Sequence, residues 1–200
     1  MAVRLPVHSP NQRIGLYGGS FNPAHEGHVT LARHALKKLK LDHVWWLVSP
    51  QNPLKSADET ADMDERIAIA ESLVTNPSMV ITDVERQIGS TCTADTLRAL
   101  KPTLENGNFV WIMGADSFAE LHKWQDWQVI PNALPLAVFD RPGWRYKALS
   151  SQAARRYADE KLAPENAPLL LSSPAPTWAF LPMPLRYESS SAIRAARKLQ

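Results

Sequence analysis

The sequence predicts an α/β fold, in which a doubly wound and mainly parallel β-sheet is covered by helices on both faces. The first observation behind this prediction is that short apolar runs alternate along the chain with stretches whose apolar residues recur at helical spacing. The second is the first run itself, which leads through a glycine pair into a helical pattern, as a strand, a tight turn and a helix would. With 200 residues, of which 44% are hydrophobic and 21% charged, the chain suits one globular domain.

The first half of the chain contains three expected strands and two expected helices. An apolar run at 14–17 ends at a glycine pair, and "VTLARHALKKLKL" then shows helical spacing over 29–41. "HVWWLVS" at 43–49 is a continuous apolar run, which predicts a buried strand. A helical pattern at 63–74 precedes another apolar run, "MVITDV", at 79–84. These elements follow one another as strand, helix, strand, helix and strand.

The second half continues the alternation and then changes character. Helices are expected at 93–100 and 118–124, and strands at 108–115 and 134–140. The segment 162–188 is rich in proline and is expected to be an extended connector with one short strand, "WAFLPM". The final segment, "SSSAIRAARKLQ", begins like an N-capped helix.

Composition excludes several classes of protein. The formal net charge is only +2, so the sequence indicates no broad basic surface and no nucleic-acid partner. The single cysteine, Cys92, cannot form an intrachain disulfide, which suits a reducing compartment, and no Cys/His cluster has zinc spacing. The start of the chain does not resemble a secretory signal, and no run approaches the roughly 18 apolar residues of a membrane span. We therefore expect a cytoplasmic protein with no membrane partner.

The expected domain organisation is simple. Residues 1–13 are predicted to be an N-terminal extension, and residues 14–200 to be a single domain that includes the last helix. The oligomeric state is left open, a homo-oligomer included.

The first turn has the residues of a phosphate site. In a parallel sheet, ligands bind beyond the carboxyl ends of the strands, where Gly18 and Gly19 stand. Glycines let backbone N–H groups approach a ligand closely, and the next helix directs its positive end to the same point. His25 and His28 fall on one side of the helix entry, three residues apart. The stretch therefore predicts a pocket for an oligophosphate with two imidazole donors. It matches neither the P-loop nor the G-x-G-x-x-G pattern.

"GGSFNPAHEGH" at 18–28 resembles the signature G-G-x-F-(D/N)-P-x-H-x-G-H of the nucleotidyltransferases related to class I aminoacyl-tRNA synthetases. Within them, the chain is most similar to the nicotinate-nucleotide adenylyltransferase family, with matching blocks in the same order from Gly15 to Arg194. The resemblance implies a Rossmann-like fold and transfer of AMP from ATP to nicotinate mononucleotide, which gives deamido-NAD and pyrophosphate. The sequence has no clustered carboxylates that indicate a built-in metal site, so Mg²⁺ is expected to arrive with ATP.

The resemblance also implies which residues bind ATP. "MGADSF" at 113–118 and "SSSAIR" at 189–194 match two further family blocks. Asp116 would accept hydrogen bonds from ribose hydroxyls, and the structural alternative, a helix N-cap, is compatible with that role. His25 and His28 would donate to the phosphates as charge builds at the reacting phosphorus, and Arg194 would stabilise the departing pyrophosphate. The implied ATP-binding residues are Gly18, Gly19, Ser20, Phe21, His25, His28, Gly114, Asp116, Ser190, Ser191 and Arg194.

Nicotinate mononucleotide would be bound by a second group. The implied residues are Asn52, Lys55, Thr93, Trp124 and Arg141. Trp124 would stack on the nicotinate ring and Lys55 would act as a point charge on the attacking phosphate. Three of these residues have a plain structural alternative: Trp124 as a core tryptophan, Lys55 as a solvated lysine and Thr93 as a helix cap. Cys92 stands where the family usually has a tyrosine.

Two other functions stay open from the sequence. One is an adenylyltransferase for another acceptor, such as nicotinamide mononucleotide or phosphopantetheine. The other is a nucleotide-binding module without catalytic activity. An assay of pyrophosphate release distinguishes this inactive module from an adenylyltransferase for either kind of acceptor.

Overall fold

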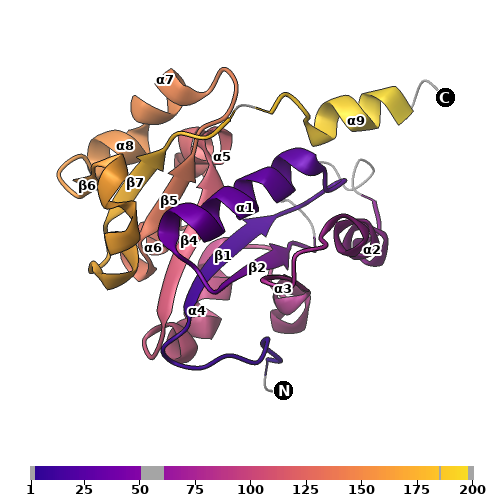
Figure 1. Ribbon diagram of the computed structural model, residues 1–200, viewed down its shortest axis with the longest axis horizontal. Coiled ribbons are helices and arrows are strands. Elements are labelled where there is room, and N and C mark those ends of the chain that lie inside the picture. The colour runs from indigo at the N-terminus through magenta and orange to yellow at the C-terminus, as the bar shows by residue number, and fades with distance from the viewer. Residues whose placement is uncertain (1–2, 51–60, 185, 198–200) are drawn as a thin grey trace.

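The fold is built on a parallel β-sheet of seven strands, seen in a computed structural model that describes residues 3–50, 61–184 and 186–197 (Figure 1). Every strand pair in it is parallel, and the order across the sheet is β3-β2-β1-β4-β5-β7-β6. The strands are β1 (Arg13–Gly19), β2 (His43–Val48), β3 (Met79–Thr82), β4 (Asn108–Gly114), β5 (Leu136–Phe139), β6 (Lys161–Leu162) and β7 (Trp178–Leu181).

The strand order makes the sheet doubly wound. The chain builds outward from β1 through β2 to β3, and then returns to the other side of β1 with β4 and β5. It reaches the far edge with β6 and comes back to place β7 between β5 and β6. In the register, Leu16 of β1 lies between Trp45 of β2 and Trp111 of β4. The direction of building therefore reverses between β1 and β4, and ligands bind at the carboxyl ends of the strands at such a reversal. The predicted fold class is confirmed.

The helices lie between successive strands along the chain. They are α1 (Glu26–Leu39), α2 (Met63–Leu73), α3 (Val84–Ile88), α4 (Thr93–Leu104), α5 (Ala115–Glu120), α6 (Val129–Ala133), α7 (Arg145–Leu149), α8 (Gln152–Arg156) and α9 (Ser190–Arg197). The residues that the structure describes also include the 3₁₀ segments η2 (Leu121–Lys123) and η3 (Pro164–Ser172). Within the described residues, no helix has the length and apolar character needed to cross a membrane.

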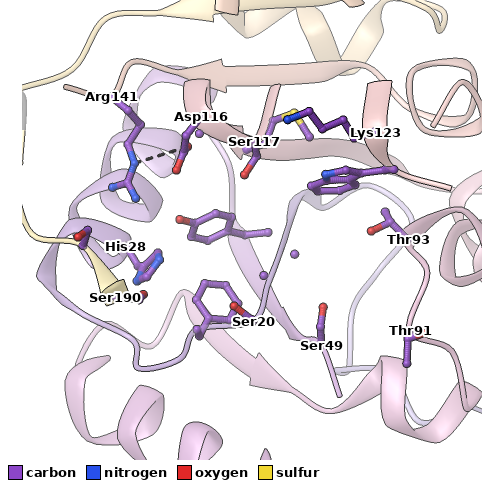
Figure 2. A pocket seen from close by; sticks show the side chains of 18 of the residues that line it. Ser20, His28, Ser49, Thr91, Thr93, Asp116, Ser117, Lys123, Arg141 and Ser190 are labelled. Carbon is purple, nitrogen blue, oxygen red and sulfur yellow. Dashed lines mark ion pairs between the residues drawn. The ribbon is translucent and has the colours of Figure 1, made fainter. Parts of the chain in front are cut away.

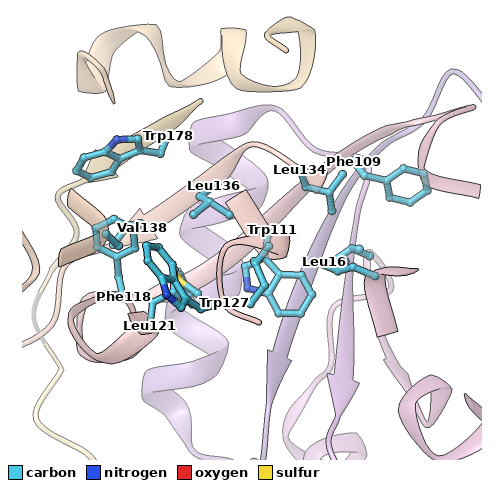
Figure 3. Close-up of a cluster of buried hydrophobic side chains, with 14 of the residues drawn as sticks. Leu16, Phe109, Trp111, Phe118, Leu121, Trp127, Leu134, Leu136, Val138 and Trp178 are labelled. Carbon is cyan, nitrogen blue, oxygen red and sulfur yellow. The ribbon is translucent and has the colours of Figure 1, made fainter. Parts of the chain in front are cut away.

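Two hydrophobic cores cover the two faces of the sheet, because successive side chains of a strand point to opposite faces. In β2, Trp45 belongs to one core and Trp46 to the other. The first core contains side chains of α4, α5 and α6, and the second contains side chains of α1, α2 and η3. Figure 3 shows part of the first core, in which aromatic side chains such as Trp111, Phe118 and Trp178 pack together. This is why the strands have continuous apolar sequences rather than alternating ones.

Three sequence predictions about elements were wrong in detail. The run at 79–84 is a strand only to Thr82, and the buried Val84 begins α3 instead. Helix α1 starts three residues before the predicted 29, because His25 caps it. The segment 162–188 is not simply an extended connector, since η3 begins with Pro164 and buries Leu170 and Leu171 against the second core. Proline is compatible with the first turn of a helix, so its abundance did not exclude one there.

The first described residues lie against the sheet rather than away from it. Val3 and Leu5 pack on the first core, and the ring of His8 lies edge-on to Trp45 with the centroids 5.0 Å apart. The division into an extension, 1–13, and a domain, 14–200, stays a prediction.

Candidate active site

A pocket of about 470 Å³ lies at the carboxyl ends of β1, β2 and β4, where the strand order reverses. Its size suits a nucleotide-sized ligand. The residues that line it are Tyr17, Gly18, Gly19, Ser20, Phe21, His28, Ser49, Thr91, Cys92, Thr93, Met113, Gly114, Asp116, Ser117, Lys123, Trp124, Gln125, Arg141, Ser189, Ser190 and Ser191. Figure 2 shows Arg141, His28 and Ser190 at one end and Thr93 at the other, with Ser20 and Ser49 between them.

Aromatic packing at Gly18 and an unusual backbone conformation at Phe21 shape the turn after β1. The indole of Trp111 occupies the space beside Gly18, where a Cβ would lie 2.6 Å from its ring. Phe21 has a φ of 43°, which a bulky residue seldom adopts, and its ring packs edge-on to Tyr17. The sequence predicts that Gly18 serves the turn geometry and lets backbone N–H groups approach a ligand closely. The structure adds a packing reason for this glycine.

His25 and His28 are joined at the start of α1. His25 is the N-cap, and its Nδ1 accepts a hydrogen bond from the Gly27 N–H at 3.1 Å. The Nδ1 of His28 accepts in turn from the His25 N–H at 3.2 Å. Because each Nδ1 is an acceptor, each neutral ring carries its proton on Nε2. Gly27 makes this possible, since a Cβ there would lie 2.8 Å from the His25 ring.

Both imidazoles are neutral near pH 7. Burial, together with a smaller effect of the positive charge of Arg141, lowers the pKa of His25 to about 4 against the opposing effects of Glu188 and Asp116. Burial also places the pKa of His28 well below its usual range, with His25 and Arg141 acting in the same direction. His28 lines the pocket and can offer a ligand this neutral Nε2–H donor, whereas His25, to which the sequence assigns the same role, does not line it. The Nε2 of His25 is buried and has no hydrogen-bond partner among the described residues.

Arg141 stands beside this pair rather than at the other end of the pocket. Its Nε lies 3.7 Å from Asp116 Oδ1, and its side chain is only 13% exposed (Figure 2). The buried Asp140 accepts a hydrogen bond from the Arg141 N–H at 2.9 Å and another from Arg145 Nε at 2.8 Å. These contacts hold the loop after β5 so that Arg141 faces the histidines.

Helix α9 crosses the turn after β1 at the same end. The Ser190 hydroxyl donates to the Pro23 carbonyl at 3.0 Å, and Arg194 Nη1 donates to the Asn22 carbonyl at 2.6 Å. Ser190 and Ser191 line the pocket, whereas Arg194 is partly buried against the turn and does not line it. Its guanidinium thus contacts the backbone of the turn after β1, and its predicted contact with the ATP phosphates stays a prediction.

The other end of the pocket is built by the start of α4 and the end of η2. Thr93 opens α4, and the preceding Cys92 holds Gln125 through a contact of 3.6 Å between its Sγ and the Gln125 carbonyl. Trp124 directly follows η2 and is half-buried. It thus lies at the predicted place in the pocket, while Trp45, Trp46 and Trp111 are buried in the cores as expected.

The cytidylyltransferase-like family model matches residues 16–196. A probable nicotinate-nucleotide adenylyltransferase of Methylorubrum extorquens is 50% identical over 182 residues, which cover 91% of this chain and 98% of that protein. A protein of the same description from Ruegeria pomeroyi is 46% identical and covers 98% of this chain and 92% of its own length. The chain belongs to the nicotinate-nucleotide adenylyltransferase family. It is therefore a nucleotidyltransferase, and the family expected from the sequence is confirmed.

A solved structure shows the same fold at low identity. The nicotinic acid mononucleotide adenylyltransferase of Plasmodium falciparum, in a complex with NaAD, is 16% identical to this chain and has a TM-score of 0.67. The match covers 92% of this chain and 83% of that one. This chain thus shares its Rossmann-like fold with that solved structure.

Several pocket residues of this nicotinate-nucleotide adenylyltransferase family member were not predicted. They are Tyr17, Ser49, Thr91, Cys92, Met113, Ser117, Lys123, Gln125 and Ser189. Most of them directly follow or precede a predicted site residue, so adjacency to the matched blocks was the available signal. Asn52 and Lys55, which the sequence assigns to nicotinate mononucleotide, lie outside the described residues.

Proposed function

We propose that this chain transfers AMP from ATP to nicotinate mononucleotide and releases pyrophosphate, so that its product is deamido-NAD. The observation that carries the proposal is the division of one pocket into two ends. The neutral Nε2–H donor of His28 and the guanidinium of Arg141 stand at one end, and Thr93 and Trp124 at the other. Relatives named for this reaction at 46–50% identity support the same assignment.

ATP fits the end that contains His28, Asp116 and Ser190. Glycines and the positive end of α1 favour phosphates there, and Asp116 can accept hydrogen bonds from ribose hydroxyls. The ion pair with Arg141 leaves Asp116 36% exposed, which permits this contact. The position of Arg141 beside the histidines favours the ATP phosphates as its partner. The sequence instead assigned Arg141 to nicotinate mononucleotide.

Nicotinate mononucleotide fits the end formed by Thr93 and Trp124. An indole can stack on the flat nicotinate ring, and the first N–H groups of α4 can receive its carboxylate. The 5′-phosphate would then face the centre of the pocket. There, one of its oxygens attacks the α-phosphorus of ATP while the bond to the β-phosphate oxygen breaks, and pyrophosphate departs.

Catalysis in this scheme comes from positioning and charge stabilisation, since no side chain becomes covalently attached. The His25 and His28 Nε2–H groups donate to phosphate oxygens as negative charge grows on them. Arg194 would hold the turn from behind and stay near the leaving pyrophosphate. Among the described residues that line the pocket, Asp116 is the only carboxylate, so Mg²⁺ is better supplied as Mg–ATP than held by the protein.

The test is pyrophosphate release from Mg–ATP with nicotinate mononucleotide, nicotinamide mononucleotide and phosphopantetheine in parallel. We expect release with the nicotinate compound at a kcat/KM well above that of the other two. Release with only one of the others would keep the chemistry and change the acceptor. No release with any acceptor, despite ATP binding, would indicate a nucleotide-binding module.

A further inference from the structure

Arg66 in the first turn of α2 is a buried cation that has no place in the proposed chemistry. It is 0% exposed, and burial lowers the pKa of its guanidinium. Within the described chain no carboxylate forms an ion pair with it, and the electrostatic effect of Asp62 is smaller than that of burial. A buried charge of this kind persists only if polar groups surround it. Its surroundings therefore show what it holds.

Four backbone carbonyls surround the guanidinium. Nη1 donates to Ser20 O at 2.5 Å and to Ser49 O at 2.8 Å. Nη2 donates to Pro50 O at 2.8 Å, and Nε donates to Ala61 O at 3.0 Å. One side chain thus joins the turn after β1, the end of β2 and the start of α2. Only the planar fork of an arginine has enough donors, far enough apart, to serve all three segments.

Two of these segments form the wall of the pocket. Ser20, Phe21 and Ser49 line it, whereas Arg66 lies behind them and does not. The peptide between Ser20 and Phe21 is trans, so the Phe21 N–H points away from the Ser20 carbonyl that faces Arg66. The Phe21 N–H is therefore directed to the pocket side of the turn. The left-handed φ of 43° at Phe21 also needs such a restraint.

We propose that Arg66 is a positioning residue for adenylyl transfer, which holds the Phe21 N–H toward the phosphates through the Ser20 carbonyl. Its contacts with Ser49 and Pro50 keep this turn in register with the end of β2, so the two ends of the pocket stay at a fixed separation. The expected effect of Arg66 on the reaction rate rests on the proposed function. The expected effect of Arg66 on the direction of the Phe21 N–H does not depend on which acceptor is used.

The kinetic test compares Arg66→Lys with Arg33→Lys. Arg33 is exposed on α1 and lies outside the pocket, so it controls for the substitution itself. Per folded molecule, Arg66→Lys is expected to lower kcat at least about tenfold while the KM for ATP changes less than about threefold, because the donor is misplaced in the transition state. The control keeps both values. An unchanged kcat per folded molecule in Arg66→Lys would overturn the proposal.

A spectroscopic test separates this inference from the reaction. In the ¹⁵N-labelled wild-type protein, a non-hydrolysable ATP analogue is expected to shift the Phe21 amide resonance. In Arg66→Lys this shift is expected to be smaller by a factor of about two or more. If the analogue does not shift the Phe21 amide resonance of the wild type, the proposal is overturned, even if the variant does not fold. An equal shift in wild type and a folded Arg66→Lys variant would overturn it as well. If the wild type releases no pyrophosphate with any acceptor, the proposed function fails, and the amide shift still decides the role of Arg66.

Discussion

The imidazole rings of His25 and His28 lie with their centroids 3.8 Å apart, and each is fixed by a backbone N–H that donates to its Nδ1. The same two hydrogen bonds cap α1 and select the tautomer of both rings. Helix capping and the presentation of two Nε2–H donors are thus one structural feature. The backbone that forms the turn thus also determines which nitrogen of each ring carries the proton.

This arrangement predicts the tautomers directly. In ¹⁵N-labelled protein near pH 7, long-range proton–nitrogen correlations should show both rings neutral and protonated at Nε2, because each Nδ1 is occupied as an acceptor. The half-buried histidine of the same helix, His34, serves as a reference in the same spectrum. An Nδ1–H form at either position would contradict the assignment.

Removal of one donor should slow turnover rather than weaken binding. His28→Ala is expected to lower kcat about 100-fold, with the KM for ATP within about threefold of wild type, because its hydrogen bond strengthens as charge develops. His34→Ala is the matched control, since it lies on the same helix but does not line the pocket. A normal kcat with a raised KM for ATP would instead make His28 a ground-state binding residue.

The low pKa values of the histidine pair predict a loss of stability on acidification. The pKa of His25 falls from 6.5 in the unfolded chain to about 4 in the folded one, chiefly through burial. Between these values the unfolded chain binds more protons, so the free energy of unfolding falls as the pH is lowered through this window and is insensitive to His25 above it. Urea unfolding of wild type and His25→Asn, from about pH 7 to about pH 5, checks this.

Asparagine is a good N-cap, so His25→Asn keeps α1 capped while it removes the titrating ring. The variant should show a smaller dependence of the free energy of unfolding on pH than the wild type. An equal or steeper dependence would assign the acid sensitivity to other groups.

The end of the pocket at Trp124 should affect the acceptor alone. Trp124→Ala is expected to raise the KM for nicotinate mononucleotide about tenfold through loss of stacking, with little change in the KM for ATP, and Trp124→Phe should restore part of it. Trp144→Ala is the control, because Trp144 is also half-buried on the first core but lies outside the pocket. A parallel rise of both KM values would mean that Trp124 supports the pocket structurally.

Much of this molecule was accessible from local sequence. The strands are continuous apolar runs because both of their faces are buried, and the turn at Gly18 and the start of α9 follow from residues close together in the chain. The boundaries that failed lie where another element decides burial. Val84 begins helix α3 instead of ending β3, and Leu170 and Leu171 of η3 are buried in the second core in a segment whose prolines indicated a connector.

The site divides in the same way. The sequence by itself determined the fold class, the glycine turn, the paired histidines and the blocks that meet at the carboxyl ends of the strands. Only the tertiary structure decided that Arg141 faces His25, that Arg194 binds the Asn22 carbonyl and that the buried Arg66 joins three segments. Local periodicity records only which side of an element is buried. In contrast, Arg66 and Ser20 are 46 positions apart in the sequence, and Arg194 and Asn22 are 172 positions apart. Such partners are selected by the strand order of the sheet, which no local pattern encodes.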